Sequence, residues 1–215
     1  MLPQERSESV LQAARISFFE LKDYVKAEQY FNQLKNLATE ADIRLESMRG
    51  LLRSQYRLNK WKEAVPNAEE LLAQKGIATD DRMMAYMVVA KSAQKDNELE
   101  RAVLNYKTVV SLGKSEFGAE ARYQLAAILF QQAKYSDAEK ASFDVINKAG
   151  SYEFWTTRAY ILLGDIYWKQ KDYFNSEATY KSVAQNSTIE ELKEEAQVKL
   201  EAVVDDKNKE SKVTN

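Results

Sequence analysis

An all-α fold made of stacked helical hairpins is predicted by three features of the sequence. The chain of 215 residues contains 6 Gly and 2 Pro, fewer than turn-rich β architectures usually need. Apolar residues in 160–183 recur at helical spacing on both sides of a short turn, which Asp172 is placed to cap. This two-helix pattern occurs about five times, and stacking of such hairpins builds one continuous core.

The five copies share a spacing of small and large side chains. The small residue that opens each second helix recurs at intervals of 37, 38, 36 and 38 residues, at Ala27, Ala64, Ala102, Ala138 and Ser176. Three residues earlier stand Tyr24, Trp61, Leu99, Tyr135 and Tyr173; twelve residues earlier stand Arg15, Leu52, Ala90, Ala126 and Gly164. Four residues later stand Phe31, Ala68, Tyr106, Ser142 and Tyr180. Two antiparallel helices pack closely where a small residue sits at their crossing. We therefore expect Ala126 to contact Ala138, and Gly164 to contact Ser176.

The pattern resembles the tetratricopeptide repeat family. The fifth copy follows the family pattern almost throughout, with Tyr160, Leu163-Gly164, Tyr167, Asp172-Tyr173, Ser176 and Tyr180. The resemblance covers about residues 8–190 and implies a right-handed superhelical solenoid that binds partners. The period exceeds the family's value of about 34, so we expect longer helices or longer connections.

One array is expected over residues 1–204, with repeats at about 8–41, 45–78, 83–116, 119–152 and 157–190. An apolar stripe from Ile189 to Val203 on an otherwise charged segment predicts a capping helix over 189–204. Residues 205–215 are polar and are expected to be disordered. No polar helix precedes the first repeat, so the chain is either the C-terminal part of a longer array or is capped by its own first helix. Pro66 predicts a kink or a delayed start in a second helix.

Composition removes several function classes. The chain has no Cys and no His, which excludes disulfides, thiolate metal sites, a Cys nucleophile and imidazole catalysis. A mechanism that uses only carboxylates, or Lys and Ser, remains open, but carboxylates such as Asp165 and Glu120 have no partner at a defined spacing. We therefore expect no catalytic, metal or cofactor site. The net charge of -2 offers no global attraction to nucleic acid. No stretch approaches the ~20 apolar residues of a membrane span, and residues 1–6 lack a signal-peptide pattern. We expect a soluble cytoplasmic or periplasmic protein.

The resemblance implies that the first helix of each hairpin lines a concave groove. One repeat position carries Phe19, Tyr56, Phe130 and Trp168, with Gln94 in the third copy. An aromatic ladder of this kind could hold an extended or helical peptide. The alternative is that these rings pack between adjacent hairpins, as large aromatics usually do.

A basic stripe is expected on the same face. Arg49, Arg53 and Arg57 are spaced i, i+4, i+8, and Lys91 and Lys95 take equivalent places on the next hairpin. Such a stripe favours an acidic partner, because guanidinium groups grip carboxylates bidentately. The alternative is a solvated face that Glu46, Glu63 and Glu69 balance. The Lys/Asn carboxylate clamp of some family members is not matched, since Val88, Glu120 and Gln124 occupy its positions.

The sequence thus predicts a non-catalytic protein–protein interaction scaffold that binds a peptide or a partner domain. The candidate partner-binding residues are Arg49, Arg53, Tyr56, Arg57, Lys91, Lys95, Phe130 and Trp168. One alternative is a structural spacer in a longer solenoid of a cell-envelope or assembly complex. RNA binding is less favoured because the sequence pI is 5.5.

Overall fold

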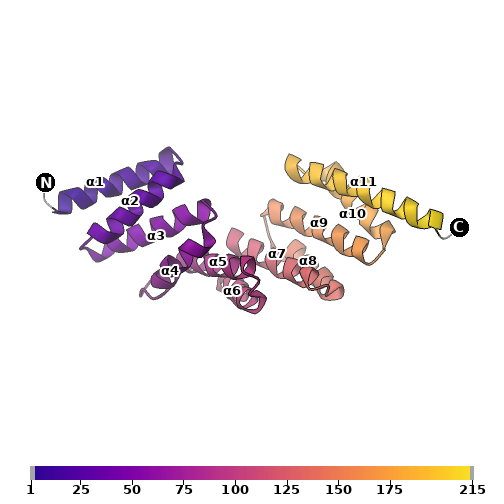
Figure 1. The fold of residues 1–215 in the computed structure, drawn as a ribbon, viewed down its shortest axis with the longest axis horizontal. Helices are drawn as coiled ribbons and strands as arrows, with labels where there is room; N and C mark the ends of the chain where they lie inside the picture. The colour runs from indigo at the N-terminus through magenta and orange to yellow at the C-terminus, as the bar shows by residue number, and fades with distance from the viewer. Residues whose placement is uncertain (1–2, 214–215) are drawn as a thin grey trace. The chain divides into compact units, whose positions relative to one another are not determined.

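The computed structural model describes residues 3–213, which form eleven α-helices, one π-helical turn and no strand (Figure 1). The chain divides into two compact units, residues 1–112 and 113–215, and each is described by itself. The predicted all-α hairpin architecture is confirmed within both units. The prediction of one continuous array over 1–204 stays a prediction.

The first unit contains three helical hairpins. Its elements are α1 (Pro3–Arg15), η1 (Ile16–Glu20), α2 (Tyr24–Leu37), α3 (Ala41–Arg57), α4 (Trp61–Leu72), α5 (Thr79–Lys95) and α6 (Leu99–Leu112). Each helix packs against the next, and the first helices α1, α3 and α5 also contact one another in sequence. Each hairpin begins about one turn before the predicted repeat boundary, at Ala41 against 45 and at Thr79 against 83.

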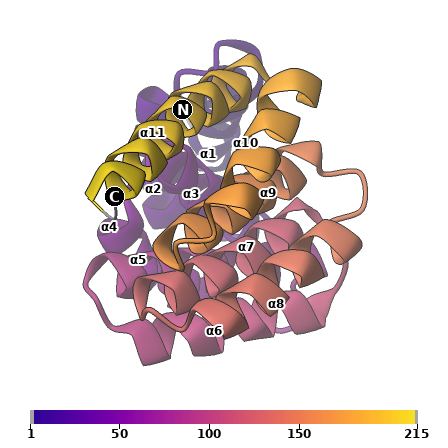
Figure 2. The same ribbon diagram turned by 90° about the vertical axis from the view of Figure 1, so that its right-hand side faces the viewer.

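The second unit contains two hairpins and a terminal helix. Its elements are α7 (Glu116–Gln131), α8 (Tyr135–Lys148), α9 (Glu153–Lys169), α10 (Tyr173–Asn186) and α11 (Glu190–Val213). Helix α11 packs along α10 and also contacts α9, as Figure 2 shows. In this unit the first helices α7 and α9 contact each other directly.

Long first helices account for the long repeat period. Helices α3, α5 and α9 each contain 17 residues, and α7 contains 16. The turn inside each hairpin is always short and has the same shape. Its middle residue has a positive φ in all five copies, at Lys22, Asn59, Asn97, Ala133 and Lys171. This left-handed residue closes the preceding helix, and the next backbone N–H bonds back into the helix, as in Lys134 N to Leu129 O at 3.0 Å.

Asn59 and Asn97 therefore close the first helices α3 and α5. Asn tolerates the left-handed conformation better than other non-glycine residues, which explains its use there. The caps of Asp23 and Asp172 are present, because Asp23 accepts from Lys26 N at 3.0 Å and Asp172 accepts from Asn175 N at 3.1 Å. Helix α4 begins at Trp61 with Pro66 inside it, so its start is not delayed.

The small residues lie where helices cross, as predicted. Ala27, Ala64, Ala102, Ala138 and Ser176 are all fully buried. Ser176 Oγ donates to the carbonyl of Gly164 at 2.9 Å, and Ala126 and Ala138 share one hydrophobic cluster. A Cβ on Gly164 would lie 2.4 Å from the Tyr180 ring, so this position needs glycine.

The first hairpin departs from the predicted alignment by one residue. Ala14 is fully buried, whereas Arg15, the predicted small-residue position, is partly exposed and pairs with Glu46. The π-helical turn Ile16–Glu20 explains the shift, because a π turn holds one residue more than an α turn. The turn-closing bond runs from Asp23 N to Ser17 O, one residue longer than Lys60 N to Gln55 O in the second copy.

Phe18, and not Phe19, therefore occupies the ladder position of the first hairpin. Phe18 packs edge-on against Tyr24 at 5.3 Å between ring centroids, as Tyr56 does against Trp61 at 5.0 Å. Phe19 is the extra residue that the π turn accommodates, and 62% of its surface is exposed.

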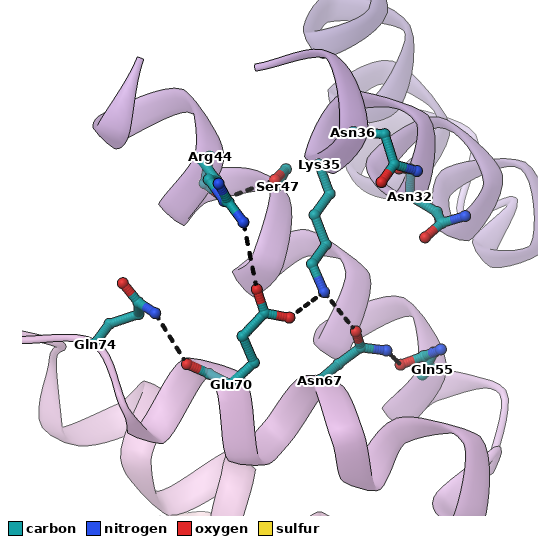
Figure 3. A network of polar contacts seen from close by, with 9 residues as sticks. All are labelled: Asn32, Lys35, Asn36, Arg44, Ser47, Gln55, Asn67, Glu70 and Gln74. Atoms are coloured by element: carbon teal, nitrogen blue, oxygen red, sulfur yellow. Dashed lines mark hydrogen bonds and ion pairs between the residues drawn. The ribbon is translucent and has the colours of Figure 1, made fainter. Parts of the chain in front are cut away.

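A polar network ties α2, α3 and α4 together (Figure 3). Lys35 of α2 donates to Asn67 Oδ1 at 3.0 Å and contacts Glu70, both on α4. Asn67 in turn donates to Gln55 of α3 at 2.9 Å, and Arg44 lies 3.8 Å from Glu70. Because these groups satisfy one another, we assign the network to hairpin packing and not to a binding site.

The predicted disordered tail is corrected at residues 205–213. Helix α11 continues through them to Val213, and residues 214–215 lie outside the described range. Polar side chains of α9 and α10 contact the added turns: Trp168 Nε1 donates to Asp206 at 3.1 Å, and Tyr173 Oη donates to Glu210 at 2.5 Å. Composition alone predicted disorder because these contacts come from residues far away in the sequence.

Candidate partner-binding grooves

The first unit carries a groove of about 540 Å³ across its successive first helices. We call it the N-terminal groove. It is lined by Phe18, Phe19, Phe31, Asp42, Leu45, Glu46, Arg49, Gly50, Arg53, Ala78, Asp80 and Asp81. These residues come mainly from η1, α3 and the start of α5, so the groove crosses all three hairpins of the unit. Two predicted partner-binding residues, Arg49 and Arg53, lie in it.

Both arginines are already bound to a carboxylate of the chain. Asp81, only 3% exposed, lies 2.6 Å from Arg49 Nε and 3.1 Å from Arg53 Nη2. Arg53 donates a hydrogen bond to Asp81. Arg49 Nε forms an ion pair with Asp81 whose geometry is not that of a hydrogen bond. The carboxylate that balances Arg49 and Arg53 is therefore Asp81, and not Glu46, Glu63 or Glu69 as the sequence pattern suggested.

The other members of the basic stripe have separate environments. Lys91 Nζ lies over two aromatic rings, 4.9 Å from the centroid of Trp61 and 5.9 Å from that of Tyr56. Desolvated cation–π contacts of this kind stabilise packing by about 1–2 kcal/mol. Arg57 and Lys95 are exposed at the ends of their helices. The five cations are therefore not one uniform stripe of unpaired charge.

The second unit carries a groove of about 520 Å³ on its own first helices. We call it the C-terminal groove. It is lined by Phe130, Asp165, Trp168, Lys169, Lys171, Tyr173, Lys199 and Asp206, which come mainly from α7, α9 and α11. The structure thus brings together two predicted anchors, Phe130 and Trp168, which lie 38 positions apart in the sequence. Both rings are half-buried: they pack on the core on one side and face the groove on the other.

Hydrogen bonds hold most of the polar lining of the C-terminal groove. Asp165 accepts from Tyr180 Oη and from Lys199 Nζ, each at 2.6 Å. Burial, and then the negative charge of Asp165, raises the pKa of Tyr180, which therefore stays a hydrogen-bond donor. Lys171 pairs with Glu210. Lys169 is exposed and has no ion-pair partner among the described residues.

The ladder position does not have one role throughout. Tyr56 packs against Trp61 and lies outside the lining of the N-terminal groove. Gln94 accepts a hydrogen bond from Tyr106 Oη at 2.6 Å, inside the third hairpin. Of the ladder residues, Phe18 lines the N-terminal groove, and Phe130 and Trp168 line the C-terminal groove. Sequence reasoning missed Phe18 and Asp81, and it put Phe19 at the ladder position. The signal for this one-residue shift was the polar Arg15 at a position that the other copies keep apolar.

Among residues 3–213, no group of three or more acidic side chains is arranged to hold a metal ion. Within that range no helix has both the length and the apolar character that crossing a bilayer requires.

Comparisons with known proteins agree with this architecture. A family model described as a tetratricopeptide repeat-like domain matches residues 20–205, and no curated protein sequence matches the chain. A tetratricopeptide repeat protein from Parabacteroides merdae has a similar crystal structure, with a TM-score of 0.69 and 18% identity over 93% of this chain and 74% of that one. BtubC from P. vanneervenii gives a TM-score of 0.62 at 14% identity, over 94% and 83% of the two chains. A thermophilic TPR protein from Thermus thermophilus gives 0.57 at 16%, over 90% and 98%.

Proposed function

The chain belongs to the tetratricopeptide repeat-like domain family, and we propose that it is a non-catalytic scaffold that binds a peptide or a partner domain on its first helices. The observation that carries the proposal is the C-terminal groove. Phe130 and Trp168 come from successive hairpins and face one groove, where a single apolar side chain of a partner would contact both. Half-buried aromatic residues fixed by packing are the usual anchors of protein interfaces.

The groove also offers a charged guide beside these anchors. Lys169 is exposed and has no ion-pair partner among residues 3–213, so it would attract an acidic residue of the partner. Because Trp168 is held by Asp206 and Phe130 packs against Tyr135 at 5.8 Å, the anchors need little ordering on binding. We therefore assign the predicted acidic partner to the C-terminal groove.

Peptide selection against the full chain tests the proposal. Peptides from a displayed random library would be selected on the purified chain and their affinities measured by fluorescence anisotropy. We expect Trp168→Ala and Phe130→Ala to weaken the binding of selected peptides about tenfold or more, as truncation of an anchor does. Lys169→Glu removes no packing and should weaken acidic peptides selectively.

The matched control is Phe174→Ala. Phe174 is 79% exposed on the second helix α10, outside the groove, so its truncation should leave affinity unchanged. Circular dichroism must first establish that all variants have the helicity of the parent chain. Equal affinity of parent, Trp168→Ala and Phe130→Ala would place the interface elsewhere.

A spacer role is the second candidate. It is favoured by an exposed apolar strip on the first hairpin, where Ile16, Leu21 and Val25 are 42%, 64% and 50% exposed. Such a strip fits contact with further protein of an assembly. A library that yields no peptide above background would favour this role. A salt-dependent shift with random RNA would instead revive nucleic-acid binding.

A further inference from the structure

The π-helical turn adds an exposed aromatic ring to the wall of the N-terminal groove. In the first hairpin Phe18 fills the ladder position, so the extra residue Phe19 is left with no place in the core. The rings of Phe18 and Phe19 meet edge-on at 4.9 Å between centroids, and both line the groove beside Leu45. π turns inside helices are frequent at functional sites, and this one exposes a large apolar ring beside a groove.

The charges that line this groove are predominantly negative. Carboxylates outnumber cations four to two, with Asp42, Glu46, Asp80 and Asp81 against Arg49 and Arg53. Asp81 occupies both arginines, as described above. Glu46 is bound bidentately by Arg15, with Nε to Oε1 at 2.7 Å and Nη2 to Oε2 at 2.8 Å.

Two carboxylates are left without a partner. Asp42 and Asp80 line the groove, are exposed, and have no hydrogen-bond or ion-pair partner among residues 3–213. They stand in the first turns of α3 and α5, at the positive end of each helix dipole. The charge that the groove offers to a ligand is therefore negative, in contrast to the acidic partner that the sequence pattern of Arg49 and Arg53 suggested.

We propose that the N-terminal groove binds a peptide segment with a large apolar side chain next to a lysine or arginine. The apolar side chain packs on Phe18, Phe19 and Leu45, and the cation pairs with Asp42 and Asp80. The inference rests on the proposed scaffold function and gives this groove a ligand chemistry opposite to that of the C-terminal groove. Nucleic acid is disfavoured in this groove because its unpaired groups are anionic.

The test uses the full chain and selects for dependence on Phe19. A random peptide library is selected on the parent chain and depleted on Phe19→Ala, and the enriched peptides are measured by anisotropy. We expect these peptides to carry a large apolar residue next to Lys or Arg. Their affinity should fall about tenfold with Phe19→Ala, as loss of an anchor predicts. It should fall about two- to thirtyfold with Asp42→Asn/Asp80→Asn, the range of two exposed ion pairs, and should weaken as salt is raised.

The control separates binding from helix stabilisation. Asp137→Asn removes a first-turn carboxylate of α8 outside the groove, so it should leave the affinity unchanged. Enriched peptides that are acidic, or an affinity that Asp42→Asn/Asp80→Asn leaves unaltered, would overturn the proposed ligand chemistry. If peptides bind the parent but none depends on Phe19, the inference falls and the scaffold function stands. If no peptide is selected, both fall.

Discussion

Deletion of Phe19 should be tolerated, although it removes a residue from the middle of a helical segment. The deletion restores between Ala14 and Ala27 the spacing that separates Ala126 from Ala138. It turns the π turn into an α turn and leaves Phe18 in the ladder position, followed directly by Glu20. Phe19 is 62% exposed, and full burial of a Phe side chain stabilises by about 1.5–3 kcal/mol, so the deletion should cost about 1 kcal/mol or less.

Deletion of Lys169 is the matched control. Lys169 is also exposed and follows the ladder residue Trp168, but its hairpin has no extra residue to lose. With one residue fewer, this hairpin can keep either the backbone hydrogen bonds that close its turn or the hydrogen bond from Ser176 to Gly164, but not both. Rotating the helix by one residue, about 100°, would take Leu163 and Ile166 out of the core. At about 1.5–3 kcal/mol for each buried side chain, the loss should be at least about 3 kcal/mol.

Urea unfolding followed by circular dichroism measures both deletions, with size-exclusion chromatography to exclude aggregation. The expected order of stability is parent, then the Phe19 deletion close behind, then the Lys169 deletion far below. The chain without Phe19 should also no longer bind the peptides that were selected for their dependence on Phe19. If the Phe19 deletion destabilises the chain as much as the Lys169 deletion does, Phe19 is not the extra residue of the π turn.

Three further predictions concern packing, the last helix and pH. Gly164→Ala should destabilise the chain by about 1–3 kcal/mol in urea unfolding, because the new Cβ meets the Tyr180 ring. The same substitution should cost less in a chain that also carries Tyr180→Leu. An equal cost in both chains would show that the Tyr180 ring is not the cause. A chain ending at Val204 should lose about 1–3 kcal/mol, since the bonds of Trp168 to Asp206 and of Tyr173 to Glu210 disappear. A chain ending at Glu210 should not, and no difference between the two truncations would support a disordered tail. The hydrogen bond to Glu210, with burial, raises the pKa of Tyr173 to about 12. Tyr173 therefore contributes its full stability below the unfolded pKa of about 10, and this contribution is lost as pH rises through 12. In a circular-dichroism titration, Tyr173→Phe should lack this part of the loss of helicity at alkaline pH. A profile identical to that of the parent chain would contradict the prediction.

The hairpin fold could be predicted because a few small side chains determine it. Ala138 and Ser176 must lie at helix crossings, and their spacing in the sequence sets the length of each hairpin. The period therefore located every helix pair to within about one turn. The repeat pattern did not reveal the π turn, because it put the small residue of the first helix twelve residues before Ala27, at Arg15. The buried small residue is Ala14, one residue earlier.

The sites were harder to predict, since they depend on which side chains meet across helices. Asp81 is 28 residues from Arg53, and only the packing of α5 on α3 and α4 brings its carboxylate to the two arginines. The sequence gives the cations of a helical face but not their partners. Phe130 and Trp168 line one groove because equivalent positions of successive hairpins lie on the same face; their role in binding stays a prediction.

The helical continuation beyond 204 could not be read from composition. The segment is polar and would lack a core of its own, so the sequence favoured disorder. Its stability comes from the contacts that Trp168, Tyr173 and Glu177 make with Asp206, Glu210 and Lys207. Such contacts leave no periodic apolar signal.

Site-specific photo-cross-linking distinguishes a partner that lies along the first helices from one that lies along the second helices. A benzophenone amino acid would replace Lys169 on α9 or, in a second variant, Lys181 on α10, both exposed, and a selected peptide of the C-terminal groove would be irradiated with each. Mass spectrometry then identifies the attached peptide. We expect cross-linking from position 169 and none from position 181. Cross-linking from 181 alone would place the partner on the second helices, against the proposed function.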